Sequence, residues 1–139
     1  MDFSEHLREI SSHVNAIIRE HASNLELTFA QASLLLSLPS DKISMSGLSK
    51  KLGIDVSTLT RNVQKLEAQK YIFRERDSQD QRIMNVQLTE RGEGTLDLLS
   101  AKMDECATVI LYNIPLELHQ QLGDVLEELI WSLDRYREN

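Results

Sequence analysis

Short polar and cationic side chains recur at helical spacing between residues 57 and 65. Ser57, Thr58 and Arg61 fall within two helical turns, and Lys65 follows one turn later. Hydroxyl and guanidinium groups of this kind form hydrogen bonds with base edges in the DNA major groove, and a lysine farther along reaches phosphate. The same pattern also fits an amphipathic surface helix with solvated polar groups, so this segment alone leaves both interpretations open.

The charge distribution favours contact with nucleic acid. The 139-residue chain has a formal net charge of −7, which argues against such contact, because binding is driven by cations that displace counterions from phosphates. Residues 42–91, however, contain ten basic and six acidic residues and carry +4, whereas the rest of the chain carries −11. A basic middle between acidic ends is typical of a protein that contacts nucleic acid through one part.

A helix over residues 56–69 is predicted to position the polar groups. Asp55 is a suitable N-cap, because its carboxylate accepts hydrogen bonds from the free N–H groups of the first turn. Just upstream, the sequence predicts a short helix over 47–52, with Ser46 as its N-cap and Gly53 as the residue that ends it. The longer helix has one apolar stripe opposite its polar face: Val56, Leu59, Val63 and Leu66.

A β-hairpin follows. Residues 71–76 and 83–88 alternate between apolar and polar side chains, and a polar segment, 77–82, separates them. Two short helices joined at a glycine and followed by a two-stranded ribbon are the element order of a winged helix-turn-helix. The sequence therefore predicts a mainly α fold with a small β-hairpin wing, of class α+β.

Long helices flank this region. We expect helices over 3–23, from the N-cap Thr28 to residue 38, from the N-cap Thr89 to the break at Pro115, and over 116–136, with a very short strand at 43–45. The last helix is too rich in leucine and isoleucine to be covered by one small lobe, which favours burial between two chains. A hairpin with the preceding helix of the same chain is the alternative. The expected inward positions of the last helix are Leu118, Leu122, Val125, Leu126, Leu129, Ile130 and Leu133.

Several function classes lack support in the sequence. There is no glycine-rich phosphate loop, nucleophile elbow or cluster of metal ligands, so we expect neither an enzyme nor a cofactor. The single cysteine, Cys106, cannot form an intrachain disulfide, and on its apolar stripe it is better interpreted as a small buried hydrophobe than as a redox sensor. No apolar run is long enough for a signal peptide or a membrane span, so we expect a cytoplasmic protein with no membrane partner.

Six segments of the chain stand in a distinctive order: LTFAQ (27–31), LSKKLGI (48–54), STLTR (57–61), LE (66–67), RERDSQDQR (74–82) and LTERG (88–92). Their order and spacing together resemble the MarR family of bacterial regulators. The resemblance implies a single domain over residues 1–139, with a winged helix lobe at about 28–91 and a helical dimerisation region at about 1–24 and 92–139. It further implies a homodimer through the first, fifth and sixth helices, which acts as a ligand-responsive repressor of transcription on a pseudo-palindromic operator in double-stranded DNA.

The resemblance also assigns roles to the wing. Arg82 matches the wing arginine that enters the minor groove, and Asp80 matches the acidic residue that orients it; an exposed turn pair with little energetic effect is the alternative. Two positions depart from the family pattern, because Lys70 stands where glycine is usual and Gln81 where a second arginine is usual. Lys70 must then adopt a left-handed conformation or shift the turn. The predicted DNA-binding residues are Ser57, Thr58, Thr60, Arg61, Lys65, Arg74, Arg76, Asp80 and Arg82.

An effector pocket is the least specific of these predictions. Family pockets lie between the dimerisation helices and the winged lobe, and His13 and His21 could line one, although ordinary surface or half-buried histidines are the alternative. A winged-helix dimer that serves as a protein-interaction adaptor, with weak or no DNA binding, is the competing function, because the acidic total charge and the changes at Lys70 and Gln81 would permit it.

Overall fold

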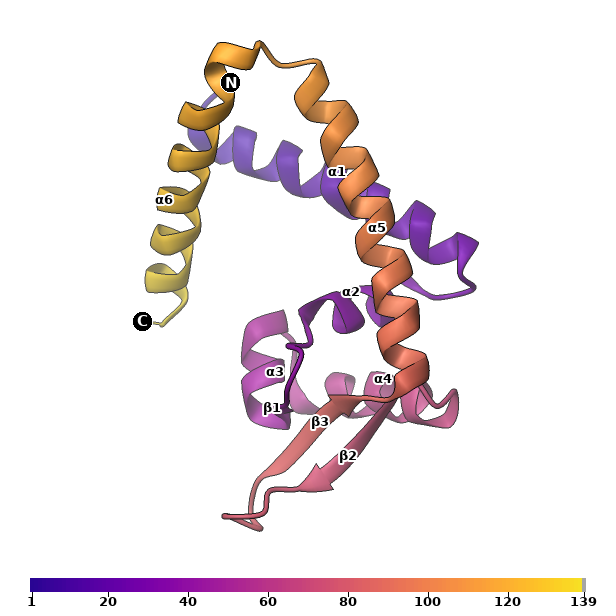
Figure 1. Ribbon diagram of the computed structural model, residues 1–139. Helices are drawn as coiled ribbons and strands as arrows, with labels where there is room; N and C mark the ends of the chain where they lie inside the picture. The colour runs from indigo at the N-terminus through magenta and orange to yellow at the C-terminus, as the bar shows by residue number, and fades with distance from the viewer. Residues whose placement is uncertain (139) are drawn as a thin grey trace. The chain divides into compact units, whose positions relative to one another are not determined.

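The computed structural model describes residues 1–138 and confirms the predicted class, a mainly helical chain with one small antiparallel sheet (Figure 1). The chain divides into two compact units, Met1–Met103 and a second unit that begins at Asp104. The elements in order are α1 (Phe3–Asn24), α2 (Phe29–Ser37), β1 (Ile43–Ser44), α3 (Met45–Leu52), α4 (Val56–Ala68), β2 (Ile72–Arg76), β3 (Met84–Leu88), α5 (Glu90–Tyr112), a 3₁₀ turn η1 (Leu116–Leu118) and α6 (His119–Glu138).

The helices α2, α3 and α4 begin at side-chain caps. Thr28 and Gln31 form a reciprocal capping box at the start of α2, and Asp55 accepts the Thr58 N–H at the start of α4, as predicted. The predicted cap of α3 is wrong: Ser44, not Ser46, accepts the Gly47 N–H, because the strand is two residues long and the helix begins directly after it.

One core joins these helices to the sheet and to α1. Leu59, Val63 and Leu66 of α4 have no exposed surface and lie in one buried cluster with Leu48 of α3, so the apolar stripe of α4 anchors that helix as predicted. The predicted stripe is wrong at its first position, because Val56 is 56% exposed. It lies in the first turn of α4, where the helix projects beyond the core.

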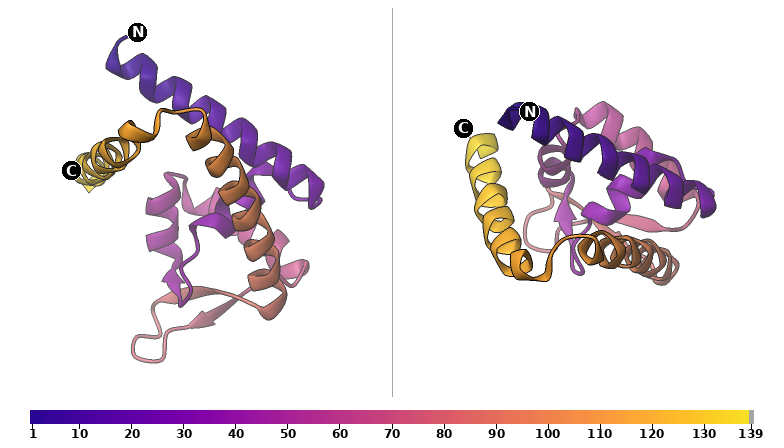
Figure 2. Two further views of the ribbon diagram at one scale, coloured as in Figure 1. Left: turned by 45° about the horizontal axis from the view of Figure 1, so that its top comes forward. Right: turned by 90° about the horizontal axis from the view of Figure 1, so that it is seen from above.

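The sheet has three strands in the order β1-β3-β2, all antiparallel. The two predicted wing strands are confirmed to within one residue, and Arg74 lies opposite Val86 in their register. The short strand β1 pairs with β3 and so ties the segment after α2 to the base of the wing. In Figure 1 and in the left view of Figure 2, the β2–β3 hairpin extends away from the helices of its lobe, which leaves its tip accessible.

Lys70 lies in the turn between α4 and β2 and has a left-handed backbone conformation. Its φ of 66° lies in the left-handed region, so the first of the two predicted options is the one adopted. The Lys70 N–H donates to the Glu67 carbonyl and the Tyr71 N–H donates to the Leu66 carbonyl, which is the Schellman pattern that usually has glycine at this position. Glu26, with φ 58°, occupies the same position in a second Schellman turn after α1, which was not predicted from the sequence.

The start of α5 packs tightly against the turn between α4 and β2. Thr89 caps α5 as predicted, because its hydroxyl oxygen accepts the Gly92 N–H at 3.0 Å. A Cβ atom on Gly92 would overlap the carbonyl oxygen of Tyr71. Glycine is therefore required here by close backbone approach rather than by its own conformation.

The second unit contains the end of α5, η1 and α6. The last helix starts three residues later than predicted. Pro115 leads into the 3₁₀ turn, and α6 begins only at His119. The His119 ring lies 2.9 Å from the carbonyl oxygens of both Leu111 and Ile114, so it bonds the end of α5 to the turn. The predicted inward face of α6 is largely open to solvent in the single chain: Leu118, Val125, Leu126, Ile130 and Leu133 are all exposed.

Candidate nucleic-acid interface

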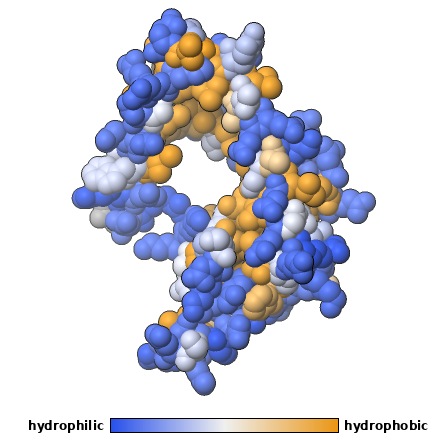
Figure 3. Space-filling model, viewed as in Figure 1, coloured by the Kyte–Doolittle hydropathy of each residue, from blue (hydrophilic) through white to orange (hydrophobic). Residues whose placement is uncertain are grey.

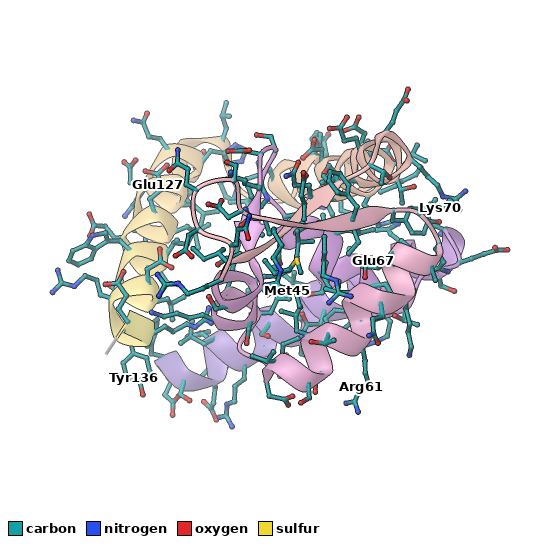
Figure 4. All side chains as sticks on the ribbon, turned by 90° about the horizontal axis from the view of Figure 1, so that it is seen from below. Met45, Arg61, Glu67, Lys70, Glu127 and Tyr136 are labelled. Carbon is teal, nitrogen blue, oxygen red and sulfur yellow. The ribbon has the colours of Figure 1, made fainter. Side chains whose placement is uncertain are left out.

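The solvent-facing side of α4 is the first element of the candidate interface. Ser57 and Arg61 are exposed on it at positions i and i+4, and Figure 4 shows Arg61 pointing away from the lobe. Gln64 continues the same face at i+7 and is also exposed. Gln64 was not among the residues predicted from the sequence, although its spacing from Ser57 was a usable signal. Lys65 is exposed beside it.

The two threonines of this helix are held by local hydrogen bonds. The Thr58 hydroxyl donates to the Asp55 carboxylate at 2.9 Å, and the Thr60 hydroxyl donates to the Val56 carbonyl at 2.7 Å. The backbone N–H of Thr58 and then its hydroxyl lower the pKa of Asp55, which keeps this capping carboxylate charged. Arg61 reaches back to the Thr58 hydroxyl at 3.4 Å. Thr58 and Thr60 are therefore engaged in shaping the helix, whereas Ser57, Arg61, Gln64 and Lys65 face outward.

Two of the predicted wing cations are engaged within the lobe. Arg74 lies half-buried on β2 and forms an ion pair with Glu67 of α4, with its Nε at 3.0 Å and its Nη2 at 2.9 Å from one carboxylate oxygen. Arg76 is exposed and its Nη1 donates to the Gln81 carbonyl at 3.2 Å, across the wing loop. Arg74 thus joins the base of the wing to α4, and Arg76 braces the wing loop.

The wing tip presents one guanidinium on a fixed carboxylate. Arg82 donates from Nε and Nη2 to the two oxygens of Asp80, at 3.0 and 3.1 Å, and the Arg82 backbone N–H donates to the same carboxylate. These bonds raise the pKa of Arg82 and lower that of Asp80. The Arg82 side chain is nevertheless 90% exposed, so its remaining donors point into solvent. The structure therefore brings the two predicted residues together.

Asp77 lies at the base of the wing loop and was not singled out in the sequence. Its carboxylate accepts hydrogen bonds from Asn85, Lys42 and two backbone N–H groups of the loop. The Asn85 amide and then the loop N–H groups lower the pKa of Asp77 from 3.8 to about 2. An aspartate at the start of a polar loop is a common turn former, and that was the available signal; the long-range donors were not visible in the sequence.

The predicted effector histidines do not form one cluster. His13 is exposed and lies 3.6 Å from Glu9 on the same helix, and His21 lies half-buried two turns later. Eight residues of helix separate their Cα atoms by about 12 Å. Among residues 1–138 there is no group of three His, Cys, Asp or Glu side chains that could hold a metal ion. In the same described part of the chain, no helix is long and apolar enough to cross a bilayer.

The helix α4 is anchored in the core and has a polar outer face. The short helix α3 precedes it, and a hairpin with an exposed arginine follows it. This arrangement defines a winged helix-turn-helix of the DNA-binding class. A model described as "MarR family" matches residues 25–83 of this chain. The HTH-type transcriptional regulator SarZ of Staphylococcus epidermidis is 31% identical over 119 residues, which cover 82% of this chain and 78% of that protein. The chain belongs to the MarR family of transcriptional regulators.

Two further similar proteins extend the comparison. The uncharacterized HTH-type transcriptional regulator YdgJ of Bacillus subtilis is 32% identical over 96 residues, and the chain spans only 58% of its length. A crystal structure of the S. aureus MepR–DNA complex superimposes with a TM-score of 0.76 at 23% identity, covering 96% of this chain and 99% of that one. Family membership confirms the prediction that this chain is a DNA-binding regulator and not an enzyme.

Proposed function

We propose that this chain binds double-stranded DNA sequence-specifically through α4 and the wing, and acts as a repressor. The observation that supports the proposal best is the presentation of two outward cations, Arg61 and Arg82, on separate elements of one lobe. A helix of this width fits the major groove, and a guanidinium at a hairpin tip suits the negative potential of a narrow minor groove. A protein with this function acts where the chromosome lies, in the cytoplasm.

The proposed interface consists of two kinds of residue. Ser57, Arg61 and Gln64 face the bases, and Lys65 faces phosphate. Thr58, Thr60, Arg74, Arg76 and Asp80 act indirectly, because their polar groups are engaged in holding the helix and the wing. This division assigns a role to each residue predicted from the sequence and adds Gln64.

A homodimer completes the proposal. Large apolar side chains are exposed on α1, on the end of α5 and on α6, and a monomer rarely leaves so much apolar surface in water. Figure 3 shows such residues at the surface around the turn between α5 and α6. A second copy of the chain would bury these faces and present two lobes to a pseudo-palindromic operator, as expected for a two-fold symmetric protein.

The experiment that tests DNA binding compares two variants on a duplex selected from random sequence. Arg61→Ala removes a cation that faces base edges, so the affinity should fall by about 1–3 kcal/mol per half-site and the preference at one base pair should relax. Arg82→Ala should weaken binding to many sequences together and alter preference through A·T content. If both variants bind the selected duplex as tightly as the parent at fixed salt, the proposed interface is wrong.

The dimer is tested separately. Leu126→Glu places a charge on the exposed apolar face of α6, and an unpaired charge in a protein interface costs several kcal/mol. We expect the variant to dissociate in light scattering at a concentration where the parent is dimeric. Glu127→Ala, a change to an outward carboxylate beside it, is the matched control and should remain dimeric. A stable monomer for the unchanged protein would refute this part of the proposal.

The protein-interaction adaptor remains the competing function, because the total charge is negative. A salt titration of duplex binding distinguishes the two. Binding through phosphates loses affinity steeply as salt rises, since neutralised phosphates release their counterions. Absence of any salt-sensitive binding to duplex DNA would favour the adaptor. Response to a small-molecule effector stays a proposal from the family, and His13 and His21 are its candidate residues.

A further inference from the structure

One carboxylate at the base of the wing loop accepts hydrogen bonds from three separate segments. Oδ2 of Asp77 accepts the backbone N–H groups of Gln79 and Asp80, at 3.1 and 3.0 Å. Oδ1 accepts the Asn85 side-chain amide at 2.9 Å and the Lys42 ammonium at 3.3 Å. The donors come from the wing loop, from β3 and from the segment that links α2 to β1.

These contacts are sheltered from water. The Asp77 side chain is only 17% exposed and Asn85 is 6% exposed, although both lie next to an open hairpin tip. A charge-assisted hydrogen bond in such surroundings is stronger than one at a fully exposed site. The ordinary role of an aspartate at a loop would need only the two backbone bonds. The two side-chain donors tie the loop to the rest of the lobe.

The same contacts lead to the exposed arginine. Asp77 holds the backbone N–H of Asp80, and the Asp80 carboxylate holds the guanidinium of Arg82 through two bonds. The Asp77 N–H donates to the Ile83 carbonyl, and the Ile83 N–H donates to the Asp80 carbonyl, which closes the loop. The backbone between Asp80 and Ile83 is thus fixed at both ends.

We propose that Asp77 is a positioning residue for DNA binding. Through Asp80 it sets the location of the Arg82 guanidinium, and through its contact with Lys42 it ties the wing loop to the segment between α2 and β1. This inference rests on the proposed function, because it concerns the cation that enters the minor groove. A long guanidinium side chain loses less conformational freedom on binding when its loop is already ordered. The sequence has a single arginine at this tip, with Gln81 beside it, so the placement of Arg82 matters more.

The experiment is a double-mutant cycle on the full chain, with affinity for the selected duplex measured at fixed salt. Arg82→Ala should weaken binding about tenfold or more, and Asp77→Ala about three- to tenfold. Because Asp77 acts through Arg82, adding Asp77→Ala to Arg82→Ala should cost less than twofold further. Ser78→Ala, an exposed change in the same loop, is the matched control and should bind as the parent does.

A second readout needs no DNA. The Nε–H of Arg82 donates to Asp80, so its nuclear magnetic resonance signal should be resolved in the parent and in Ser78→Ala, and lost or shifted in Asp77→Ala. Asp77→Asn keeps one carbonyl oxygen for the loop N–H groups and should give an intermediate affinity. It also serves if Asp77→Ala does not fold, as judged by thermal unfolding.

The outcomes separate the two proposals. If the parent shows no salt-sensitive duplex binding, the proposed function fails, and the Arg82 signal still decides whether Asp77 positions that side chain. If the parent binds and Arg82→Ala weakens it, but Asp77→Ala binds normally or the two losses multiply, the positioning role is refuted. Non-additive losses together with a changed Arg82 signal support it.

Discussion

Replacing Lys70 with glycine should stabilise the protein. Lys70, labelled in Figure 4, follows the end of α4 with a φ of 66°, a conformation that side chains with a Cβ adopt at a cost. Its backbone hydrogen bonds close the Schellman turn and do not involve the side chain. Glycine can therefore make the same turn without that cost.

The expected magnitude comes from three opposing effects. A left-handed residue with a Cβ costs about 1–2 kcal/mol. Glycine also lowers the free energy of unfolding by about 0.4–1 kcal/mol, because it increases the conformational freedom of the unfolded chain. Loss of a lysine near a helix C-terminus removes a favourable charge interaction of about 0.3 kcal/mol. We therefore expect Lys70→Gly to raise the free energy of unfolding by about 0.5 kcal/mol per chain.

The assay is urea unfolding at one fixed protein concentration, because the stability of a dimer depends on concentration. Lys70→Ala removes the charge but keeps the Cβ and should not stabilise. Glu26→Gly changes the other left-handed residue and should also stabilise, whereas Lys65→Gly inside α4 should destabilise by about 1 kcal/mol. If Lys70→Gly destabilises the protein while Glu26→Gly stabilises it, the reasoning about this turn is wrong.

Three further outcomes are expected. Gly92→Ala should destabilise by about 1–3 kcal/mol in the same unfolding assay, because the new Cβ would overlap the Tyr71 carbonyl. Cys106→Ser should retain DNA affinity, and mild peroxide should leave the parent's affinity unchanged, since this half-buried thiol lies outside the proposed interface. The folded-state pKa of Asp77 is about 2 rather than 3.8, so its contribution to stability is fully present above about pH 3.8 and is lost as the pH falls through about 2. The amide chemical shifts of Gln79 and Asp80 should therefore move with a midpoint near 2, and a midpoint at 3.8 or above would contradict the hydrogen-bond geometry.

The sequence predicted helix ends well where one residue type meets a local requirement, such as a side-chain cap or a left-handed backbone conformation. Asp55 and Thr89 cap helices because their side chains accept the free N–H groups at a helix start, and Gly53 ends α3 with a φ of 68°. The cap of α3 was misplaced because Ser44 and Ser46 are both suitable residues. Only the pairing of β1 with β3, a contact far along the chain, decides between them.

Tertiary contacts explain what the sequence could not supply for the site. Arg74 and Arg82 are alike in the sequence, yet one is half-buried against Glu67 and the other is exposed at the tip. Asp77 and Asp80 likewise lie in the same short polar segment, and their sequence neighbours do not distinguish them. Only the folded lobe brings Lys42 and Asn85 to the first of them. Spacing predicts which face of a helix a residue occupies, but not which partner reaches it from another element.

The charge of each part of the chain limits where DNA can be contacted. Residues 104–138 contain eight acidic and two basic residues, a net charge of −6, so this unit repels phosphate. Contact is left to residues 42–91, where Arg74 is engaged with Glu67. The other nine basic residues of this stretch are exposed, but its six acidic residues reduce the net charge to +4, so we expect the affinity of a single lobe for phosphate to be low. In the proposed dimer the contacts of two lobes add, so we expect specific binding without strong non-specific attraction. The placement of Arg61 and Arg82 would then matter more than the number of cations.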